Sequence, residues 1–255
     1  MIEKIRKNQF LFEELVKRDF KQKYKRTMLG MAWSVFYPLL NLIVMRIIFT
    51  RFFGNDMEHY TTYLFAGNLV FSYFREATMG GMNALTGNAH IFSKVNVPKY
   101  MFVLSKNVSA FINFLLTLVV FFVFAVIDQV PFTFKFILIV YPIGCLIVFN
   151  IGMGLILSAL YMFFRDLSYL YDVFTTLLMY MSAIFYTVDI YPPFMQTLFL
   201  CNPVYVYIKY IRIVMLDGNI PSLAFHTLAL GYALVAVLAG GIIYKKYNHQ
   251  FLYYI

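Results

Sequence analysis

Long apolar runs separated by short polar segments occupy most of the chain. Residues 107–127, 136–164 and 218–244 contain no charged side chain, and three further runs contain only one or two. A helix needs about 20 mostly apolar residues to cross a bilayer, so each run suits a membrane span. The pattern predicts six transmembrane helices, at about residues 31–53, 60–79, 107–127, 136–164, 167–188 and 218–244.

A seventh apolar stretch, residues 190–208, differs from the others because prolines interrupt it. Pro192, Pro193 and Pro203 lack a backbone N–H donor, and their rings clash with the preceding turn of a helix. Such broken segments persist in a membrane only where protein or a water-filled cavity surrounds them. We expect an outer re-entrant hairpin here, made of two short helices that dip into the membrane and return.

Composition excludes two broad classes of protein. Hydrophobic residues make up 62% of the 255 residues and charged residues only 13%, with a mean hydropathy of +0.72. An ordinary soluble domain is roughly 45–50% apolar and 25% charged. The chain is therefore neither a soluble globular enzyme nor a disordered segment. We expect an all-α membrane protein with one domain over residues 1–255 and no separate catalytic domain.

Basic residues are concentrated in alternate connections, which predicts the orientation of the chain. With a cytoplasmic N-terminus, the inner segments hold fifteen Lys and Arg residues and the outer loops hold four. Cytoplasmic segments are enriched in these residues, so both termini are expected in the cytoplasm. The net charge of +9 is then a topology signal rather than a nucleic-acid-binding surface. The basic first 26 residues lack the apolar run of a cleavable signal.

Two inner segments are candidates for contact with a partner. Residues 8–26 predict an amphipathic helix that lies in the membrane interface, either as a topology anchor or as a docking surface. Residues 85–100 are too apolar for a free loop, and Ile91 is one of the residues that must be covered. Asn88 is placed to cap a short helix there. This segment packs either against the amphipathic helix or against a partner.

Few charges lie inside the predicted spans, and each costs roughly 2.5–3.5 kcal/mol near the centre of a helix. Arg46 lies near the end of its span, where it can reach the interface. Arg75 and Glu76 are deeper and point about 100° apart, so they cannot pair fully with each other. The sequence allows two roles for these residues: an ion pair with another helix, or a contact in a gate or with the substrate.

Between the fourth and fifth spans, Arg165 and Asp166 predict a tight turn with local charge pairing.

Signatures of catalysis and metal binding are missing from the sequence. It contains no GxxxxGK[ST], HExxH or GxSxG, and the four histidines lack ligand spacing. We expect no enzymatic activity, cofactor or metal on this chain. Cys145 and Cys201 form no disulfide framework, and no glycines in the spans have GxxxG spacing.

Aromatic residues make up 20% of the chain, with 21 Tyr and 29 Phe but a single Trp. Those inside or beside the predicted spans include Phe36, Tyr37, Tyr169, Tyr171, Phe174, Tyr180, Phe185 and Tyr186. A path lined by aromatic rings would let the C–H faces of sugars slide without tight binding. Lipid-facing or interhelical packing explains the same pattern.

An ordered set of short motifs runs through the chain. Residues 15–40 contain Arg18-Asp19, Lys21, Tyr24, Leu29-Gly30, Trp33 and Pro38-Leu39. They are followed by Lys94-Val95, Pro98-Lys99, Arg165-Asp166-Leu167, Ile184-Phe185-Tyr186, Pro192-Pro193, Asn202-Pro203 and Arg212. This set resembles the permeases of type-2 ABC exporters that move polysaccharides such as O-antigen, teichoic acid or capsule. The chain departs from that family at Thr27, where Ser is frequent, and at Cys201, where Leu is usual.

The resemblance implies the permease subunit of an exporter of a lipid-linked polysaccharide in the bacterial cytoplasmic membrane. Two copies of the chain would form a twelve-helix pore, and two ABC ATPase subunits that bind ATP and Mg would dock beneath it. The expected ATPase-coupling residues are Arg18, Asp19, Tyr24, Asn88, Ile91, Lys94, Lys99, Arg165 and Asp166. The expected pathway and gate residues are Trp33, Tyr37, Glu76, Tyr180, Phe185, Tyr186, Pro192 and Pro193.

The sequence is also compatible with two other functions. A type-2 ABC exporter of a lipid or a drug would share the same motifs, and a membrane assembly protein without a transport role would share the composition. A membrane-embedded glycosyl or acyl transferase is disfavoured, because the acidic and histidine residues do not cluster at an interface.

Overall fold

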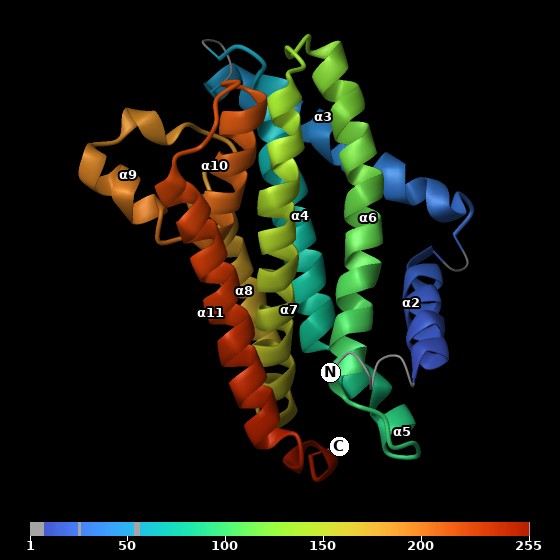
Figure 1. Cartoon of the computed structure of the whole chain (residues 1–255). Helices are drawn as coiled ribbons and strands as arrows, with labels where there is room; N and C mark the ends of the chain where they lie inside the picture. Colours follow the sequence, from blue (N-terminus) through green and yellow to red (C-terminus); the bar gives the residue numbers. More distant parts are fainter. Residues whose placement is uncertain (1–7, 25–26, 54–56, 255) are drawn as a thin grey trace.

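The computed structural model describes residues 8–24, 27–53 and 57–254, which form helices joined by short connections (Figure 1). No strand occurs within these ranges, so the predicted all-α class is confirmed. The longer helices are α2 (Gln9–Tyr24), α3 (Trp33–Phe53), α4 (Tyr60–Met82), α6 (Tyr100–Ile127), α7 (Val140–Phe163), α8 (Leu167–Met181), α10 (Pro203–Met215) and α11 (Leu223–Tyr247). The shorter ones are η1 (Gly30–Ala32), η2 (Thr86–Asn88), α5 (Ala89–Phe92), η3 (Phe134–Ile139), η4 (Val188–Ile190), α9 (Pro193–Phe199) and η5 (Gln250–Leu252).

Three helical segments among the described residues are long and apolar enough to cross a membrane: Tyr100–Ile127, Phe134–Phe163 and Leu223–Tyr247. The bent pair of α9 and α10 counts as a fourth if it is one span. The apolar part of α3 is shorter, and the 15 residues of α8 are about 22 Å long, against a hydrocarbon core of about 30 Å. A count of six spans therefore stays a prediction.

Helix α4 forms the centre of the bundle, although its sequence is less apolar than that of its neighbours. It packs against α6, α7 and α10, and side chains such as Leu64 and Phe65 are fully buried. Its polar groups find partners on neighbouring helices. The Tyr171 hydroxyl of α8, for example, donates to the Thr78 hydroxyl at 2.7 Å, and Thr78 donates in turn to the Phe74 carbonyl. These partners let a helix with many polar groups occupy the core.

Helices α7 and α11 approach so closely that only glycine fits at their contact. A Cβ atom on Gly152 would lie 2.3 Å from the carbonyl carbon of Ala236, and one on Gly240 would lie 2.6 Å from the Gly152 oxygen. Helices α4 and α7 meet similarly, because a Cβ on Gly81 would lie 2.8 Å from the Cα of Gly154. Small residues permit such close backbone contact in membrane bundles. The contacts combine glycines of different helices, so no GxxxG pair marks them in the sequence.

The connections that the sequence assigns to the cytoplasm gather at one end of the bundle, the lower end in Figure 1. One buried cluster there joins α2, α5, α6, α11 and η5 through residues that include Leu15, Phe92, Phe102, Tyr244 and Phe251. The basic segments of the chain are therefore packed together rather than hanging as separate loops.

The connections assigned to the outer side gather at the opposite end. The Asp128 carboxylate, after α6, accepts hydrogen bonds from the N–H and the hydroxyl of Thr62 at 3.1 and 2.7 Å. The Lys135 ammonium donates to the carbonyl of Gly218 at 2.6 Å. Connections that the sequence places on the same side thus lie at the same end of the bundle.

Arg212 on α10 is buried and determines where α8 ends. Its guanidinium donates to the carbonyl oxygens of Ala183, Ile184 and Tyr63 at 2.8 to 3.0 Å and lies over the Tyr63 ring. Ala183 has φ +49°, in the left-handed region, which a right-handed helix cannot contain. The expected span at 167–188 is therefore shorter in the structure. Helix α8 ends at Met181, and Arg212 holds the carbonyls that follow.

The proline-rich stretch forms two short helices, α9 and α10, bent by 106° at the break between them. Pro193 and Pro203 each begin a helix, where the missing N–H has no helical partner to lose. Asn202 caps α10, because its Oδ1 accepts from the N–H of Val204 at 3.0 Å, while its Nδ2 donates to the Ser182 hydroxyl at 2.9 Å. Helix α10 continues to Met215, beyond the expected limit at residue 208.

Candidate functional site: the helix α2 surface and the α3–α4–α6 pocket

Helix α2 packs on α6 through a buried carboxylate. The Asp19 side chain is only 1% exposed and lies 2.8 Å from the Arg18 guanidinium and 3.0 Å from the Lys106 ammonium. The Ser105 hydroxyl also donates to it, at 3.3 Å. Arg18 in turn donates to Oδ1 of Asn88 at 2.7 Å. This network attaches α2 both to α6 and to the 85–100 segment.

The contacts of α2 advance along α6 in the same direction. Leu15 shares a buried cluster with Phe102, near the start of α6, and Asp19 pairs with Lys106 one turn further on. Helix α2 therefore runs alongside α6, as Figure 1 shows, whereas the sequence led us to expect a helix in the plane of the membrane interface. The charge pairs hold it in this position. Tyr24 ends α2, and its side chain lies outside the described residues.

The 85–100 segment packs on α2, which is one of the two arrangements that the sequence allows. Ile91 lies against the buried cluster that contains Leu15. Asn88 precedes α5 but caps none of its N–H groups. Its side chain instead accepts from Arg18 and donates to the Ala84 carbonyl at 2.7 Å. The predicted capping role is therefore wrong, because the amide joins two segments.

Two lysines of this segment have different surroundings. The Lys99 ammonium is buried, donates to the carbonyl of Asn248 at 2.6 Å and lies 5.5 Å from the ring centroid of Phe251. Burial lowers the pKa of Lys99. Lys94 and its neighbour Val95 are exposed. Lys94 is thus accessible to a partner, whereas Lys99 ties the segment to the chain after α11.

The turn between α7 and α8 is short and exposed. Arg165 donates to the carbonyl of Tyr254 at 3.3 Å and lies over the Tyr161 ring, 5.4 Å from its centroid. The expected charge pairing with Asp166 is absent between these two described residues. Arg165 binds the C-terminal segment instead.

Arg75 and Glu76 pair with different elements. The Arg75 guanidinium lies 3.3 Å from the Asp172 carboxylate on α8. Both carboxylate oxygens of Glu76 lie 2.9 Å from the Lys23 ammonium, and one accepts from Nδ2 of Asn113 at 2.6 Å. Both residues therefore make the ion pairs with other helices that one interpretation of the sequence expects.

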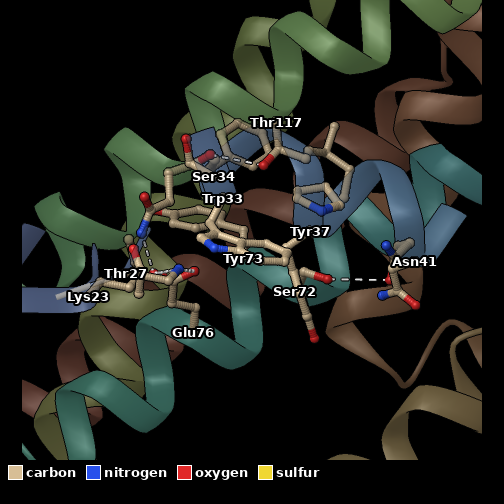
Figure 2. Close-up of a pocket in the computed structure, with 16 residues that line it drawn as sticks. Lys23, Thr27, Trp33, Ser34, Tyr37, Asn41, Ser72, Tyr73, Glu76 and Thr117 are labelled. Carbon is tan, nitrogen blue, oxygen red and sulfur yellow. Dashed lines mark hydrogen bonds and ion pairs between the residues drawn. The ribbon is translucent and has the colours of Figure 1, made fainter. Parts of the chain in front are cut away.

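Glu76 and Lys23 form part of the wall of a pocket of about 430 Å³ between the end of α2 and helices α3, α4 and α6 (Figure 2). The residues that line it are Lys23, Thr27, Trp33, Ser34, Tyr37, Pro38, Asn41, Asn68, Leu69, Ser72, Tyr73, Glu76, Ala110, Asn113, Phe114 and Thr117. The structure thus brings together three of the expected pathway residues, Trp33, Tyr37 and Glu76.

The other expected gate residues lie outside this pocket. Phe185 stacks on a phenylalanine near the end of α3, with ring centroids 4.3 Å apart. The Tyr186 hydroxyl donates to the carbonyl of Tyr180 at 2.8 Å, where α8 ends. Pro192 and Pro193 lie at the start of α9. The predicted set therefore divides between the pocket and the outer end of the bundle.

A comparison of the sequence with protein families gives one match over most of the chain. The family model described as ABC-2 type transporter matches residues 11–216. The chain belongs to the ABC-2 type transporter family. The match begins in α2 and reaches the end of α10, so it includes every residue that lines the pocket. This ABC-2 transporter chain is a multi-pass membrane protein.

Individual relatives extend the similarity to almost the full length. The ABC-2 transporter chain is 28% identical over 251 residues to the O-antigen export system permease protein RfbA of Klebsiella pneumoniae, covering 95% of each chain. A second Klebsiella pneumoniae protein of that name is 25% identical over 249 residues, again covering 95% of each chain. The RfbA protein of Myxococcus xanthus is 26% identical over 179 residues, covering 69% of this chain and 68% of that one.

The amide groups of the pocket are not among the functional residues expected from the sequence. Asn41, Asn68 and Asn113 lie inside or beside apolar runs, where polar side chains are costly unless they have a partner or a function. That cost is the signal by which the sequence could have identified them. The role of Arg212 also depends on the fold, because the carbonyls that it binds lie 28 to 149 residues away along the chain.

Proposed function

We propose that this chain is the membrane-spanning permease subunit of an ATP-driven exporter that moves a lipid-linked polysaccharide across the bacterial cytoplasmic membrane. The observation that carries the proposal is the similarity to O-antigen export permeases over 95% of both chains. Membership of the ABC-2 family supports an ABC ATPase as the partner, and two such subunits would bind ATP and Mg.

The proposed topology has six spans, with α2, the 85–100 segment, the α7–α8 turn and both termini in the cytoplasm. It is supported by the separation of inner and outer connections to opposite ends of the bundle. It also accounts for the excess of Lys and Arg in the inner segments. In this topology the bent pair of α9 and α10 is a re-entrant outer gate, anchored to the bundle by Arg212 and Asn202.

Helix α8 supports the proposed pairing of two copies. Its buried residues are only Tyr171 and Thr175. The Arg75–Asp172 ion pair is about half exposed beside it, in a shallow hollow of about 550 Å³ that Tyr180 also lines. Charged groups that face hydrocarbon are expensive. A second copy or a water-filled pathway against this face avoids that cost, and we place the pore of the dimer here.

The exposed tip of the 85–100 segment is the proposed contact with the ATPase. Lys94 and Val95 are accessible there. A force on the tip would pass to α2 through the Arg18–Asn88 hydrogen bond and to the end of α11 through Lys99. Arg165 and Asp166 are exposed on the α7–α8 turn, which the proposed topology places on the same cytoplasmic side.

The proposal is tested by deleting the gene in its native host and restoring it with a tagged copy. Deletion should remove the surface polysaccharide while its lipid-linked form accumulates inside, and the tagged protein should co-purify with an ATPase that carries a P-loop. An intact glycan with altered lipids or drug resistance would favour the other class of exporter. A protein that purifies alone and folded would favour an assembly role.

Variants of the tip make the test more specific. Lys94→Glu combined with Val95→Asp should abolish co-purification of the ATPase while leaving membrane insertion intact. Ile91 is less suitable for substitution in this test, because it packs in the buried cluster with α2. Phe134→Asp is the matched control, since Phe134 is fully exposed at the opposite end of the bundle. Normal ATPase binding by the double variant would contradict the proposed contact.

A further inference from the structure

The pocket between α2, α3, α4 and α6 presents polar groups beside two apolar helices, α3 and α6. It borders the middle of α6, a helix long and apolar enough to cross a membrane. Polar groups at such a level are costly, and they mark functional sites when they face a cavity. A volume of about 430 Å³ lies within the range of roughly 300–1,000 Å³ found for small-molecule sites.

One wall of the pocket is a stripe along α3. Trp33, Tyr37 and Asn41 follow one another at intervals of four residues, so they lie on one face of the helix. Their side chains make no hydrogen bond to another described residue, so the indole N–H, the phenol and the amide are free to bind a ligand. Tyr37 is 67% exposed, so the stripe is accessible from outside the bundle.

The opposite wall supplies further polar groups and no net charge. Asn68 and Ser72 on α4 and Thr117 on α6 line the cavity. Figure 2 shows the side chains of Ser72 and Thr117 there. Lys23 and Glu76 are the charged residues among the described lining, and they pair with each other at 2.9 Å. Among the described residues, the lining therefore offers no unpaired cation for a phosphate group, and it suits an uncharged ligand.

We infer that this pocket binds a neutral sugar residue of the transported glycan, an inference that rests on the proposed function. The negative faces of Trp33 and Tyr37 attract the C–H groups of a sugar ring. Amide side chains both donate and accept, so Asn41 and Asn68 suit the adjacent hydroxyls of a sugar. The rings of Trp33 and Tyr37 on α3, together with the amides of Asn41 on α3 and Asn68 on α4, supply both the stacking and the hydrogen-bonding groups that suit a pyranose ring.

The single tryptophan of the chain provides a direct probe, because Trp33 is the one Trp in the sequence and lines the pocket. The protein is placed in lipid nanodiscs, since maltoside detergents carry a sugar headgroup that would compete. Maltose, lactose, cellobiose and mannobiose are titrated while Trp33 emission is recorded. At least one should produce a saturable change. Tyr37→Ala and Asn41→Ala should each weaken it about tenfold.

Phe36→Ala is the matched control, because Phe36 is the exposed neighbour of Tyr37 and does not line the pocket. It should leave the response unchanged. Sodium pyrophosphate tests the charge argument, and a saturable response to it alone would overturn the assignment to a neutral ligand. Nanodiscs with lipids brominated on the acyl chains test for a lipid occupant. Strong quenching of Trp33 that no disaccharide relieves would overturn a sugar site.

The outcomes separate this inference from the proposed function. If deletion of the gene abolishes surface glycan but no disaccharide changes Trp33 emission, the pocket is not a sugar site and the exporter proposal stands. If a disaccharide binds but deletion leaves the surface glycan intact, the polysaccharide exporter proposal is wrong. A sugar response that Tyr37→Ala leaves unchanged would place the binding elsewhere and overturn the inference.

Discussion

The contact between α7 and α11 predicts a large effect from a single methyl group. In Gly152→Ala the new Cβ would lie 2.3 Å from the carbonyl carbon of Ala236, 2.4 Å from the nitrogen of Val237 and 2.6 Å from the Ala236 oxygen. Ordinary contacts begin at 3.4 Å, so the shortest distance is about 1 Å too small. All three atoms belong to the backbone, so no side-chain rotation can relieve the overlap, and the two helices must move apart.

The magnitude follows from two opposing terms. Overpacking of a core costs about 1–3 kcal/mol, and rigid backbone neighbours place this site at the upper end. Replacing glycine by alanine inside a helix returns about 0.5–1 kcal/mol. The net loss should be about 2 kcal/mol, which corresponds to a fall in Tm of about 4–8 °C for a chain of this size. The assay is the loss of monodisperse protein on heating in detergent.

Gly144→Ala is the matched control on the same helix. No atom lies within 4 Å of its new Cβ, so it should be neutral or slightly stabilising. Because the clash is with the backbone, adding Ala236→Gly should not restore the stability of Gly152→Ala. If Gly152→Ala were as stable as Gly144→Ala, or if Ala236→Gly rescued it, the close approach of α7 and α11 would be refuted.

Two further predictions concern buried charges. Asp19→Asn removes the anion that Lys106 faces and should destabilise the docking of α2 by about 3 kcal/mol, seen as faster trypsin cleavage within α2. Glu14→Gln, which removes only an exposed pair, should cleave at the wild-type rate. Arg212→Met leaves three carbonyls without their donor and should lower Tm by more than Lys209→Met on the same helix. Equal cleavage by the two α2 variants, or equal Tm for the two α10 variants, would contradict these roles.

The sequence by itself determined the all-helical class of the protein and the break within residues 190–208. Apolar runs without charges predict α6, α7 and α11, because only a helix satisfies every backbone group in hydrocarbon. The prolines of 190–208 predict two short helices, since proline begins a helix but cannot continue one. Short motifs along the chain also indicated the family to which it belongs.

The tertiary structure decided what depends on groups that are distant in sequence. Helix α8 ends at Met181 although apolar residues continue, because Arg212 binds the carbonyls beyond it. Helix α2 lies alongside α6 because Asp19 forms an ion pair with Lys106 of α6. The pocket combines groups from α2, α3, α4 and α6, and periodicity describes only one helix at a time. The local sequence pattern determines which face of a helix is polar. Packing determines which face of a neighbouring helix lies against it.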